Sequence, residues 1–509
     1  MALPLPGTPI IIDIGSAYAK VGFAGEPGPR FTFPCITGTE KYKSVMVDVS
    51  ARSVYIGDDA MKMRGVLKVK YPVQRGNIMD WNEYYEILNH IFYTLLRIEN
   101  LSNYPIIYIE HPFIPTETRE FIAKVLFETH RVKSLIMLQS PFLSLFSIGL
   151  TTGLVVESGD GITWIVPIIN GQILNQAVQK LNLAGIDVNH NLKSLLMREG
   201  INIESAAIDE ILREIKEKGC YYVLDWPPKT SDNYSYPMPD GTVKQIPNRV
   251  LHEAPEVMFQ PAMLGYNMMN IPQAIIYSLQ STNKEYWGDL LSHVVLSGGN
   301  CTYPGFEMRL KQEINALLSE LGPISKAKKI KPLFEKVGDK QKLEAFETSK
   351  KALDTCSECG TLVDLTTGVD KCPSCGAPLK RIEIAIDLGS SKDKEKSDVK
   401  TTCPYCKKEL KDKSSIYCPY CGKSIQQTKA PKLTEELLEK TNDGKEFAEF
   451  ETSDDDIIKF FIPENLQHAM FNGAAILGSL PSFQHFFITY EEFQANPNVL
   501  NRDITDVFR

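Results

Sequence analysis

Two stretches of the chain share one pattern of apolar and polar positions. In residues 9–25, an apolar β-branched run is followed by a glycine turn and by a returning strand whose apolar side chains alternate with small ones. Residues 153–168 repeat this order of apolar strand, acidic residue, glycine turn and alternating strand. The repeat indicates an internal duplication and predicts two similar lobes with a ligand site in the cleft between them.

The residues of the two turns suit a phosphate ligand. Asp13 at the end of the first strand could orient metal-bound water, Ser16 and the turn amides could cradle phosphate oxygens, and Lys20 could reach them. Gly15 permits close backbone approach. Because an Asp-x-Gly-Ser turn alone is more often a plain hairpin, this hypothesis depends on the second turn, Gly159-Asp160-Gly161. Together the two turns predict a site for a nucleoside triphosphate.

Apolar periodicity predicts further elements on either side of the second hairpin. The helix over 116–129 is expected to open with a capping residue. The helix over 204–218 carries its apolar residues on one face, so Lys216 and Glu217 are expected near its polar edge, where a charged run is usually solvated. Helices are predicted over 82–99, 116–129, 204–218 and from 306 onwards, and strands over 104–110 and 294–297.

The predicted strand at 294–297 ends at Gly298 and Gly299, ahead of Asn300 and of a helix. A strand, a glycine turn and a helix start together offer backbone amides to an anion or a ribose. This turn is therefore a further candidate for ligand binding.

A series of short motifs follows along the chain. They are Gly57-Asp58-Asp59-Ala60, Arg64-Gly65, Lys70-Tyr71-Pro72, Phe127-Glu128-Thr129, Ser158-Gly159-Asp160-Gly161, Leu183-Ala184-Gly185, Lys216-Glu217-Lys218, Phe259-Gln260-Pro261, Ser297-Gly298-Gly299-Asn300 and Tyr303-Pro304-Gly305. In this order, and with the first hairpin, they resemble the actin and actin-related protein family. The resemblance covers roughly residues 8–324 and 456–502.

The resemblance implies the α/β fold that actin shares with sugar kinases and the 70-kilodalton chaperones, in which two lobes surround an ATP cleft. An outer lobe would span residues 1–147 and be completed by 469–509. An inner lobe would span 148–324 and be completed by 453–468. The segment between them in the sequence, residues 325–452, departs from the family and is interpreted as an insertion.

The resemblance also implies a cofactor, ATP or ADP with Mg²⁺ or Ca²⁺, and roles for individual residues. Gln139 would position the water that attacks the terminal phosphate, and Glu157 stands where actin has an Asp that helps hold magnesium-bound water. Lys216 and Glu217 would contact the nucleoside. The adenosine side would be held by Gly298, Gly299, Asn300 and Tyr303.

Five positions depart from the family pattern, and they put hydrolysis in doubt more than binding. Glu157 is one methylene longer than Asp and would reach the metal differently. Trp164 replaces a His implicated in hydrolysis, and an indole cannot relay a proton. Arg75, Ile186 and Gln467 replace a His near the phosphates, an Arg at the cleft and a Lys near the adenine. Slow hydrolysis is therefore expected.

Eight of the 11 cysteines fall between residues 356 and 421 as four Cys-x-x-Cys pairs. This spacing predicts two zinc ribbons, each with a closed tetrahedral site, in preference to a redox role or to disulfides. Lysines near the pairs are interleaved with acidic residues, so a protein partner is favoured over nucleic acid. The expected ligands of the two Zn²⁺ ions are Cys356, Cys359, Cys372 and Cys375, and Cys403, Cys406, Cys418 and Cys421.

The net charge of −8 gives no electrostatic reason to expect polyanion binding by the whole chain. No apolar run reaches the length of a membrane span and no signal peptide is visible, so a cytoplasmic, cytoskeletal protein without membrane contact is expected. The favoured function is an ATP-binding actin-related protein that forms filaments or joins actin-family subunits or actin-binding proteins. The alternatives are a subunit of a chromatin or transcription complex and a small-molecule kinase.

Overall fold

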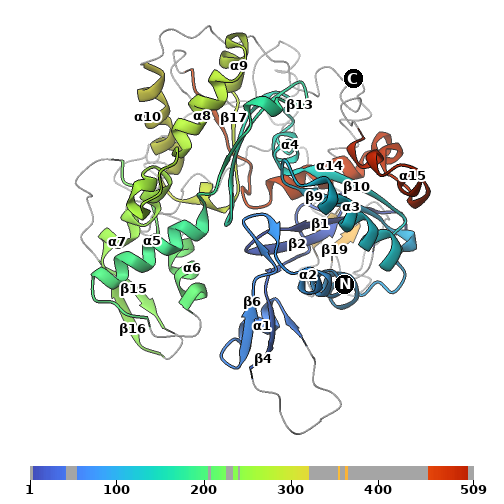
Figure 1. Cartoon of the computed structure of the whole chain (residues 1–509), viewed down its shortest axis with the longest axis horizontal. Coiled ribbons are helices and arrows are strands. Elements are labelled where there is room, and N and C mark those ends of the chain that lie inside the picture. Colours follow the sequence, from blue (N-terminus) through green and yellow to red (C-terminus); the bar gives the residue numbers. More distant parts are fainter. Residues whose placement is uncertain are drawn as a thin grey trace, which may run out of the picture. The chain divides into compact units, whose positions relative to one another are not determined.

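The computed structural model describes residues 4–41, 54–203, 208–224, 233–238, 241–319, 353–355, 362–364 and 457–502. The chain divides into two compact units, residues 1–378 with 457–509, and residues 379–456. All of the described residues belong to the first unit. Within it, two β-sheets with their helices form an outer and an inner lobe (Figure 1), as an α/β fold of two lobes requires.

The first hairpin lies in a five-stranded sheet of the outer lobe, in the order β10-β9-β1-β2-β3. β1 pairs antiparallel with β2 and parallel with β9, which confirms the predicted hairpin. β10 is parallel to β9, so three strands end at the same edge of the sheet. The strands are β1 (Ile10–Ile14), β2 (Tyr18–Phe23), β3 (Phe31–Pro34), β9 (Pro105–Glu110) and β10 (Ser134–Gln139).

The second hairpin has the same place in the sheet of the inner lobe, whose order is β13-β12-β11-β17-β20, with β14 also paired to β12. β11 pairs antiparallel with β12 and parallel with β17, as β1 does with β2 and β9. The duplication in sequence is therefore repeated in topology. The strands are β11 (Gly153–Ser158), β12 (Thr163–Ile169), β13 (Gln172–Ile173), β14 (Gln179–Leu181), β17 (Val294–Ser297) and β20 (Phe460–Phe461).

Each central strand contributes side chains to two different cores, because successive residues of a strand point to opposite faces of the sheet. Ile10 and Ile12 belong to the core of the outer lobe, and Leu154 and Val156 to that of the inner lobe. The residues between them, Ile11 and Val155, share a third core.

This third core contains two helices that lie between the sheets, α4 (Ser140–Phe146) and α14 (Ala469–Ser479) (Figure 1). The helices cross closely at Gly473, where an added Cβ would lie 2.0 Å from the carbonyl oxygen of Leu143. A side chain at position 473 would therefore push the two helices apart.

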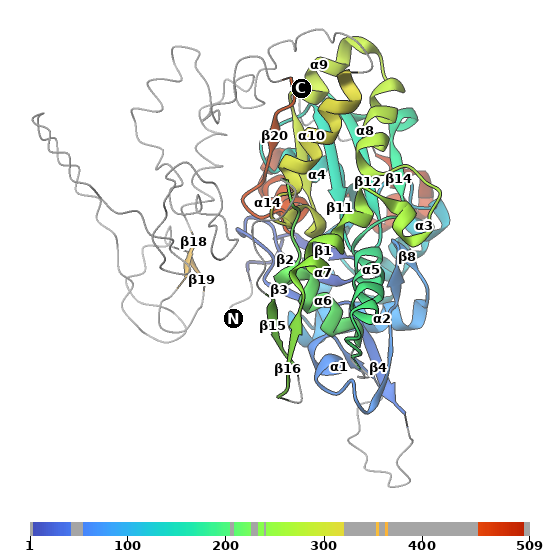
Figure 2. The ribbon, with the colours of Figure 1, turned by 90° about the vertical axis from the view of Figure 1, so that its left-hand side faces the viewer.

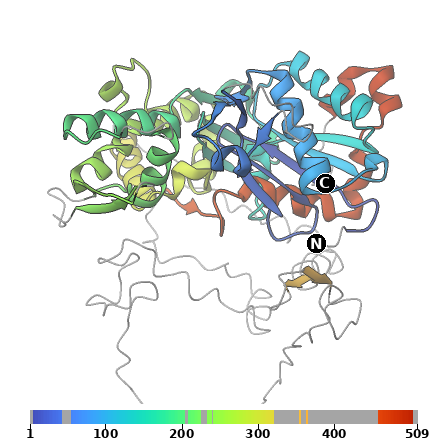
Figure 3. The same cartoon turned by 90° about the horizontal axis from the view of Figure 1, so that it is seen from below.

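The outer-lobe helices are α2 (Trp81–Asn89), which continues as a π-helical stretch over His90–Leu95, and α3 (Thr116–Lys124), which continues likewise over Val125–Thr129. These agree with the predicted helices at 82–99 and 116–129. The predicted cap is wrong, because the N-cap of α3 is Pro115, which has no side chain that can accept the free amides. Figure 3 shows these helices in the blue lobe.

The inner-lobe helices pack on the opposite side of their sheet from α4, and Figure 2 shows α8 alongside β12. The principal helices are α5 (Gly185–Arg198), α6 (Ile208–Gly219), α8 (Ile271–Gln280) and α10 (Phe306–Ser319). Shorter elements are α1 (Asp58–Lys62), α7 (Asn248–Glu253), α9 (Trp287–Leu291), α15 (Tyr490–Ala495), β4 (Thr37–Glu40), β5 (Tyr55–Ile56), β6 (Leu67–Lys70), β7 (Val73–Gln74), β8 (Asn77–Ile78), β15 (Tyr234–Pro237) and β16 (Val243–Ile246).

Two strands lie within the predicted insertion. β18 (Leu353–Thr355) pairs antiparallel with β19 (Leu362–Asp364), and the pair flanks the positions of Cys356 and Cys359 in the sequence. All eight predicted zinc ligands lie outside the described residues. Among the helices that the structure describes, none is long and apolar enough to cross a membrane.

Candidate functional site

A cavity of about 340 Å³ lies where the ends of the two hairpins meet. Its walls come from both lobes. Of the residues predicted as catalytic or cofactor-binding, Gln139 is not among those that line the cavity, although its neighbour Ser140 is. The others all line it: Asp13, Gly15, Ser16, Lys20, Glu157, Gly159, Asp160, Gly161, Lys216, Glu217, Gly298, Gly299, Asn300 and Tyr303.

The two glycine turns have the same backbone arrangement and face each other. The amide of Gly15 donates to the carbonyl of Tyr18 at 3.1 Å, and the amide of Gly159 donates to that of Ile162 at 3.1 Å. An added Cβ at Gly161 would lie 2.6 Å from Oγ of Ser16, so glycine is required there for the turns to approach. An added Cβ at Gly159 would meet no protein atom closer than 3.9 Å, so this position borders open space.

Two carboxylates from equivalent strands lie at the cavity wall. Asp13 is buried and paired with Nζ of Lys20 at 2.8 Å. Glu157 is also buried, and its Oε1 accepts a hydrogen bond from Oγ of Ser140 at 2.7 Å. Burial raises the pKa of Glu157 to about 7, and the charge of Asp13 adds to this effect. The second carboxylate oxygen of Glu157, Oε2, has no hydrogen-bond partner among the described residues.

These oxygens fit a hard divalent cation that is bound together with phosphate. Mg²⁺ is usually held by one or two carboxylates plus substrate phosphates and water, not by a complete set of protein ligands. Asp13 and Glu157 supply two carboxylates, one with a buried oxygen that has no described partner. In the part of the chain that the structure describes, no group of three or more His, Cys, Asp or Glu side chains is arranged to hold a metal alone.

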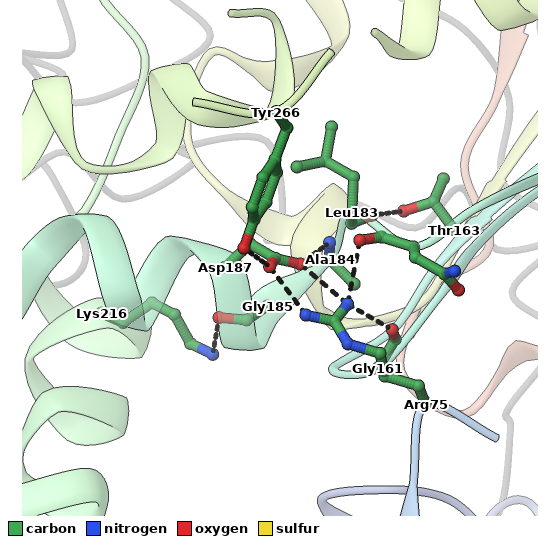
Figure 4. A network of polar contacts seen from close by, with 10 residues as sticks. Arg75, Gly161, Thr163, Leu183, Ala184, Gly185, Asp187, Lys216 and Tyr266 are labelled. Atoms are coloured by element: carbon green, nitrogen blue, oxygen red, sulfur yellow. Dashed lines mark hydrogen bonds and ion pairs between the residues drawn. The ribbon is translucent and has the colours of Figure 1, made fainter. Parts of the chain in front are cut away.

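Lys216 turns inward from α6, toward the cavity in which the resemblance places it, and away from the solvated edge that a charged run usually occupies. The residue is buried, and its Nζ donates to the carbonyl of Gly185 at 3.0 Å (Figure 4). Nζ also lies 3.4 Å from Oδ1 of Asp160. Burial also raises the pKa of its neighbour Glu217. Lys216 therefore belongs to the cavity wall, whereas Glu217 lines the cavity and is also exposed to solvent.

The glycine turn after β17 is joined to the second hairpin by Asn300. Its Nδ2 donates to the carbonyl of Gly159 at 2.7 Å, and its Oδ1 accepts from the hydroxyl of Tyr303 at 3.3 Å. This places the open backbone of Gly299, where an added Cβ would meet no atom within 4 Å, at the same cavity.

Sequence reasoning missed several lining residues, among them Tyr18, Glu110 and His111. The imidazole of His111 stacks on the indole of Trp164, with ring centroids 5.7 Å apart, and its Nε2 lies 2.7 Å from the carbonyl oxygen of Gly76. The sequence did contain a signal for His111, because the carboxyl ends of parallel strands meet at one edge of a sheet. His111 follows β9, which is parallel to β1, so it lies near the end of the strand that carries Asp13.

Comparison with known protein families matches residues 5–340 to actin, which is more than half of the 509 residues. The chain belongs to the actin family. Within this actin-family chain, the match includes both hairpins, Gln139, the pair on α6 and the turn after β17. The match begins just ahead of the first hairpin and ends within the predicted insertion.

Proposed function

We propose that this actin-family chain binds ATP with Mg²⁺ in the cavity between the two hairpins. The proposal is supported most strongly by the 340 Å³ cavity, in which both glycine turns, two carboxylates and a buried lysine converge. Turn amides other than those of Gly15 and Gly159, which donate within their own turns, would hold phosphate oxygens together with the hydroxyl of Ser16. Lys216, Glu217, Gly299 and Tyr303 would contact the nucleoside.

The proposed metal ion would be held by Asp13 and Glu157, through water or directly. It would neutralise charge on the phosphates. In this chain Lys20 pairs with Asp13, and Ser140 fixes one oxygen of Glu157, so both carboxylates have defined orientations.

Hydrolysis is proposed to be slow. Gln139 ends β10 and precedes α4, and its Oε1 is a buried acceptor without a partner among the described residues, which suits contact with a water molecule. Trp164 is buried in the cavity wall and has no group that exchanges protons near neutral pH. Gln139 does not itself line the cavity, so its proposed contact with the attacking water requires the side chain to turn toward the cavity. Deprotonation of that water would have little help from residue 164.

The proposed cellular role is that of a cytoplasmic, cytoskeletal actin-related protein that forms filaments or joins actin-family subunits or actin-binding proteins. The family membership supports this role over that of a small-molecule kinase. Electron microscopy of the purified protein with ATP, alone and with actin, tests it. Filaments, or decoration of actin filaments, are expected. Particles that stay single in both samples, together with nuclear localisation, would favour a subunit of a chromatin complex.

The insertion at 325–452 is proposed to hold two Zn²⁺ ions and to bind a protein partner. Four regularly spaced Cys-x-x-Cys pairs support the metal sites. The strand pair β18 and β19, which flanks the first Cys-x-x-Cys pair, has the antiparallel arrangement of a ribbon hairpin.

A further inference from the structure

Arg75 of the outer lobe makes all of its described side-chain hydrogen bonds with the inner lobe. It lies between β7 and β8, and its guanidinium reaches Asp187 on α5, with Nη2 2.8 Å from Oδ1 and Nη1 3.1 Å from Oδ2 (Figure 4). This pair of charge-assisted hydrogen bonds, here called the interlobe bridge, is a bidentate contact, the strongest arrangement of Arg with a carboxylate.

The backbone of Arg75 has a positive φ of 45°, which a residue with a side chain rarely adopts. Such a conformation costs free energy and persists only where the surrounding contacts demand it. Here, it directs the side chain across the boundary between the lobes. Two further carbonyl groups of the inner lobe accept hydrogen bonds from Nη1, that of Asn182 at 2.9 Å and that of Gly161 at 3.3 Å.

Asp187 is fully buried and is the centre of a small polar network. Its Oδ2 accepts from the amide of Ala184 at 2.8 Å, which caps α5, and its Oδ1 accepts from the hydroxyl of Tyr266 at 3.1 Å (Figure 4). The hydrogen bond with this carboxylate raises the pKa of Arg75. Because a buried carboxylate without a charged partner is costly, separation of the lobes would leave Asp187 without the guanidinium.

The segment that Asp187 holds is attached to the proposed phosphate site. The amide of Gly185 donates to the carbonyl of Gly159 at 3.1 Å, and that of Ile186 donates to the carbonyl of Asp160 at 2.9 Å. Nζ of Lys216 donates to the carbonyl of Gly185. Movement of the 184–187 segment would therefore displace the second glycine turn and the lysine together.

Other contacts also join the lobes near the same cavity, and two of them involve α6. The hydroxyl of Tyr71 donates to Oε1 of Glu210 at 3.0 Å, and the guanidinium of Arg213 lies 5.6 Å from the centre of the Tyr18 ring. Neither has two charge-assisted hydrogen bonds, so the interlobe bridge is the strongest of the three.

We propose that Arg75 is a positioning residue that couples closure of the lobes to the geometry of the second phosphate turn. When the bridge forms, the outer lobe is fixed to Asp187 and to Gly161, and the turn at 159–161 takes the arrangement that receives phosphate. The proposed effect on closure of the lobes does not depend on ATP binding, whereas the effect on nucleotide exchange rests on the proposed ATP binding.

The test measures the rate at which a fluorescent ATP analogue leaves the protein when unlabelled ATP is added in excess. Arg75→Met and Asp187→Asn are each expected to release the analogue about tenfold faster than wild type. The double variant should be no faster than either single one, because both remove the same bridge. The release rate of Arg75→Lys should lie between those of wild type and Arg75→Met, since Lys keeps the charge and loses the bidentate geometry.

The matched control is Arg309→Met. Arg309 pairs with Glu256 at 3.3 Å and Glu313 at 3.0 Å, entirely within the inner lobe, and its side chain is 21% exposed against 30% for Arg75. This variant should lose stability to a similar extent and keep the wild-type release rate. Release rates of both bridge variants within about twofold of wild type, or additive effects in the double variant, would overturn the proposal.

A second measurement needs no nucleotide and separates this proposal from ATP binding itself. Hydrogen exchange of peptides that cover 183–187 should accelerate in Arg75→Met and not in Arg309→Met, because the amides of Ala184, Gly185 and Ile186 lose their support. Unchanged exchange in Arg75→Met would overturn the coupling. If wild-type protein fails to bind ATP while exchange responds as expected, the bridge stands and the proposed nucleotide function fails.

Discussion

Oγ of Ser140 donates a 2.7 Å hydrogen bond to Oε1 of Glu157, and so joins the helix between the two sheets to the second carboxylate of the cavity. Ser140 is the first residue of α4, and Glu157 lies in β11 next to the second glycine turn. The contact orients one carboxylate oxygen and leaves Oε2 directed to no described partner. The position of the proposed metal-binding oxygen is thus set by the packing of α4.

Hydrolysis should become faster when both departures from the family at the cavity are reversed. The double variant Glu157→Asp, Trp164→His supplies a shorter carboxylate and an imidazole, and we expect phosphate release to rise about tenfold or more. Steady-state phosphate release measures this, with the two single variants as controls. Because Trp164 is buried, its replacement will leave a cavity that costs about 3 kcal/mol, so the assay is run below the melting temperature of the variant. Wild-type turnover at least as fast as that of actin would show that the idea is wrong.

The crossing of α4 and α14 should tolerate no side chain at Gly473. An added Cβ would lie 2.0 Å from the carbonyl oxygen of Leu143, so Gly473→Ala is expected to lower the free energy of unfolding by about 1–3 kcal/mol. At an open helical position the same change would raise stability by up to about 1 kcal/mol. The sign of the change in a urea titration therefore decides whether the close crossing exists.

The hairpins and the turn at Gly298 could be predicted from sequence because each is a local pattern of apolar strand and glycine turn. The inward direction of Lys216 was implied by the family resemblance alone, because the α6 pattern is that of an ordinary surface helix and the carbonyl that binds its Nζ belongs to Gly185, 31 positions earlier. The contact between Arg75 and Asp187 could not be predicted from local patterns either, because the two residues are far apart in the sequence. The packing of α14 against α4 depends on a segment that returns after the insertion, and no periodicity indicates its partner.

His130 should make the outer lobe less stable as the pH is lowered. This residue is buried beside the rings of Tyr85, Phe92 and Tyr93, and burial lowers its pKa to about 4. Between its ordinary pKa of about 6.5 and this value, the unfolded chain binds a proton that the folded protein does not. The contribution of His130 to stability should therefore fall by about 1.4 kcal/mol per pH unit as the pH is lowered from about 6.5 to 4. The raised pKa values of Glu110 and Glu157 act in the opposite sense, so the effect of His130 is read as a difference between two proteins.

The variant His130→Phe retains an aromatic ring and removes this titration. The urea midpoints of wild type and variant are compared between pH 6.5 and 4, and the wild type should show the steeper loss. Equal slopes in the two proteins would rule out His130 as the source.

The metal content of the purified protein tests the predicted ribbons. Two zinc ions per chain are expected from protein purified without a chelator, held by the eight cysteines between residues 356 and 421. Replacing Cys403 and Cys406 by Ser should remove about one of them, because two thiolates cannot complete a tetrahedral site. Replacing the buried Cys35 by Ser is the matched control and should leave the zinc content unchanged. Wild-type protein with less than about one zinc per chain would contradict the assignment.

The central claim, that ATP binds between the two glycine turns, is tested most directly by Gly159→Val. An added Cβ there would meet no protein atom closer than 3.9 Å, so a side chain can begin at this position without a clash, and the variant is first compared with wild type without nucleotide. It should differ from wild type only in its response to nucleotide, because the added side chain would crowd the phosphates. At an ATP concentration 100 times the dissociation constant, wild type should gain about 2.7 kcal/mol of stability, which appears as a higher Tm. The Tm of Gly159→Val should not rise with MgATP; a rise as large as that of wild type would contradict the proposed site.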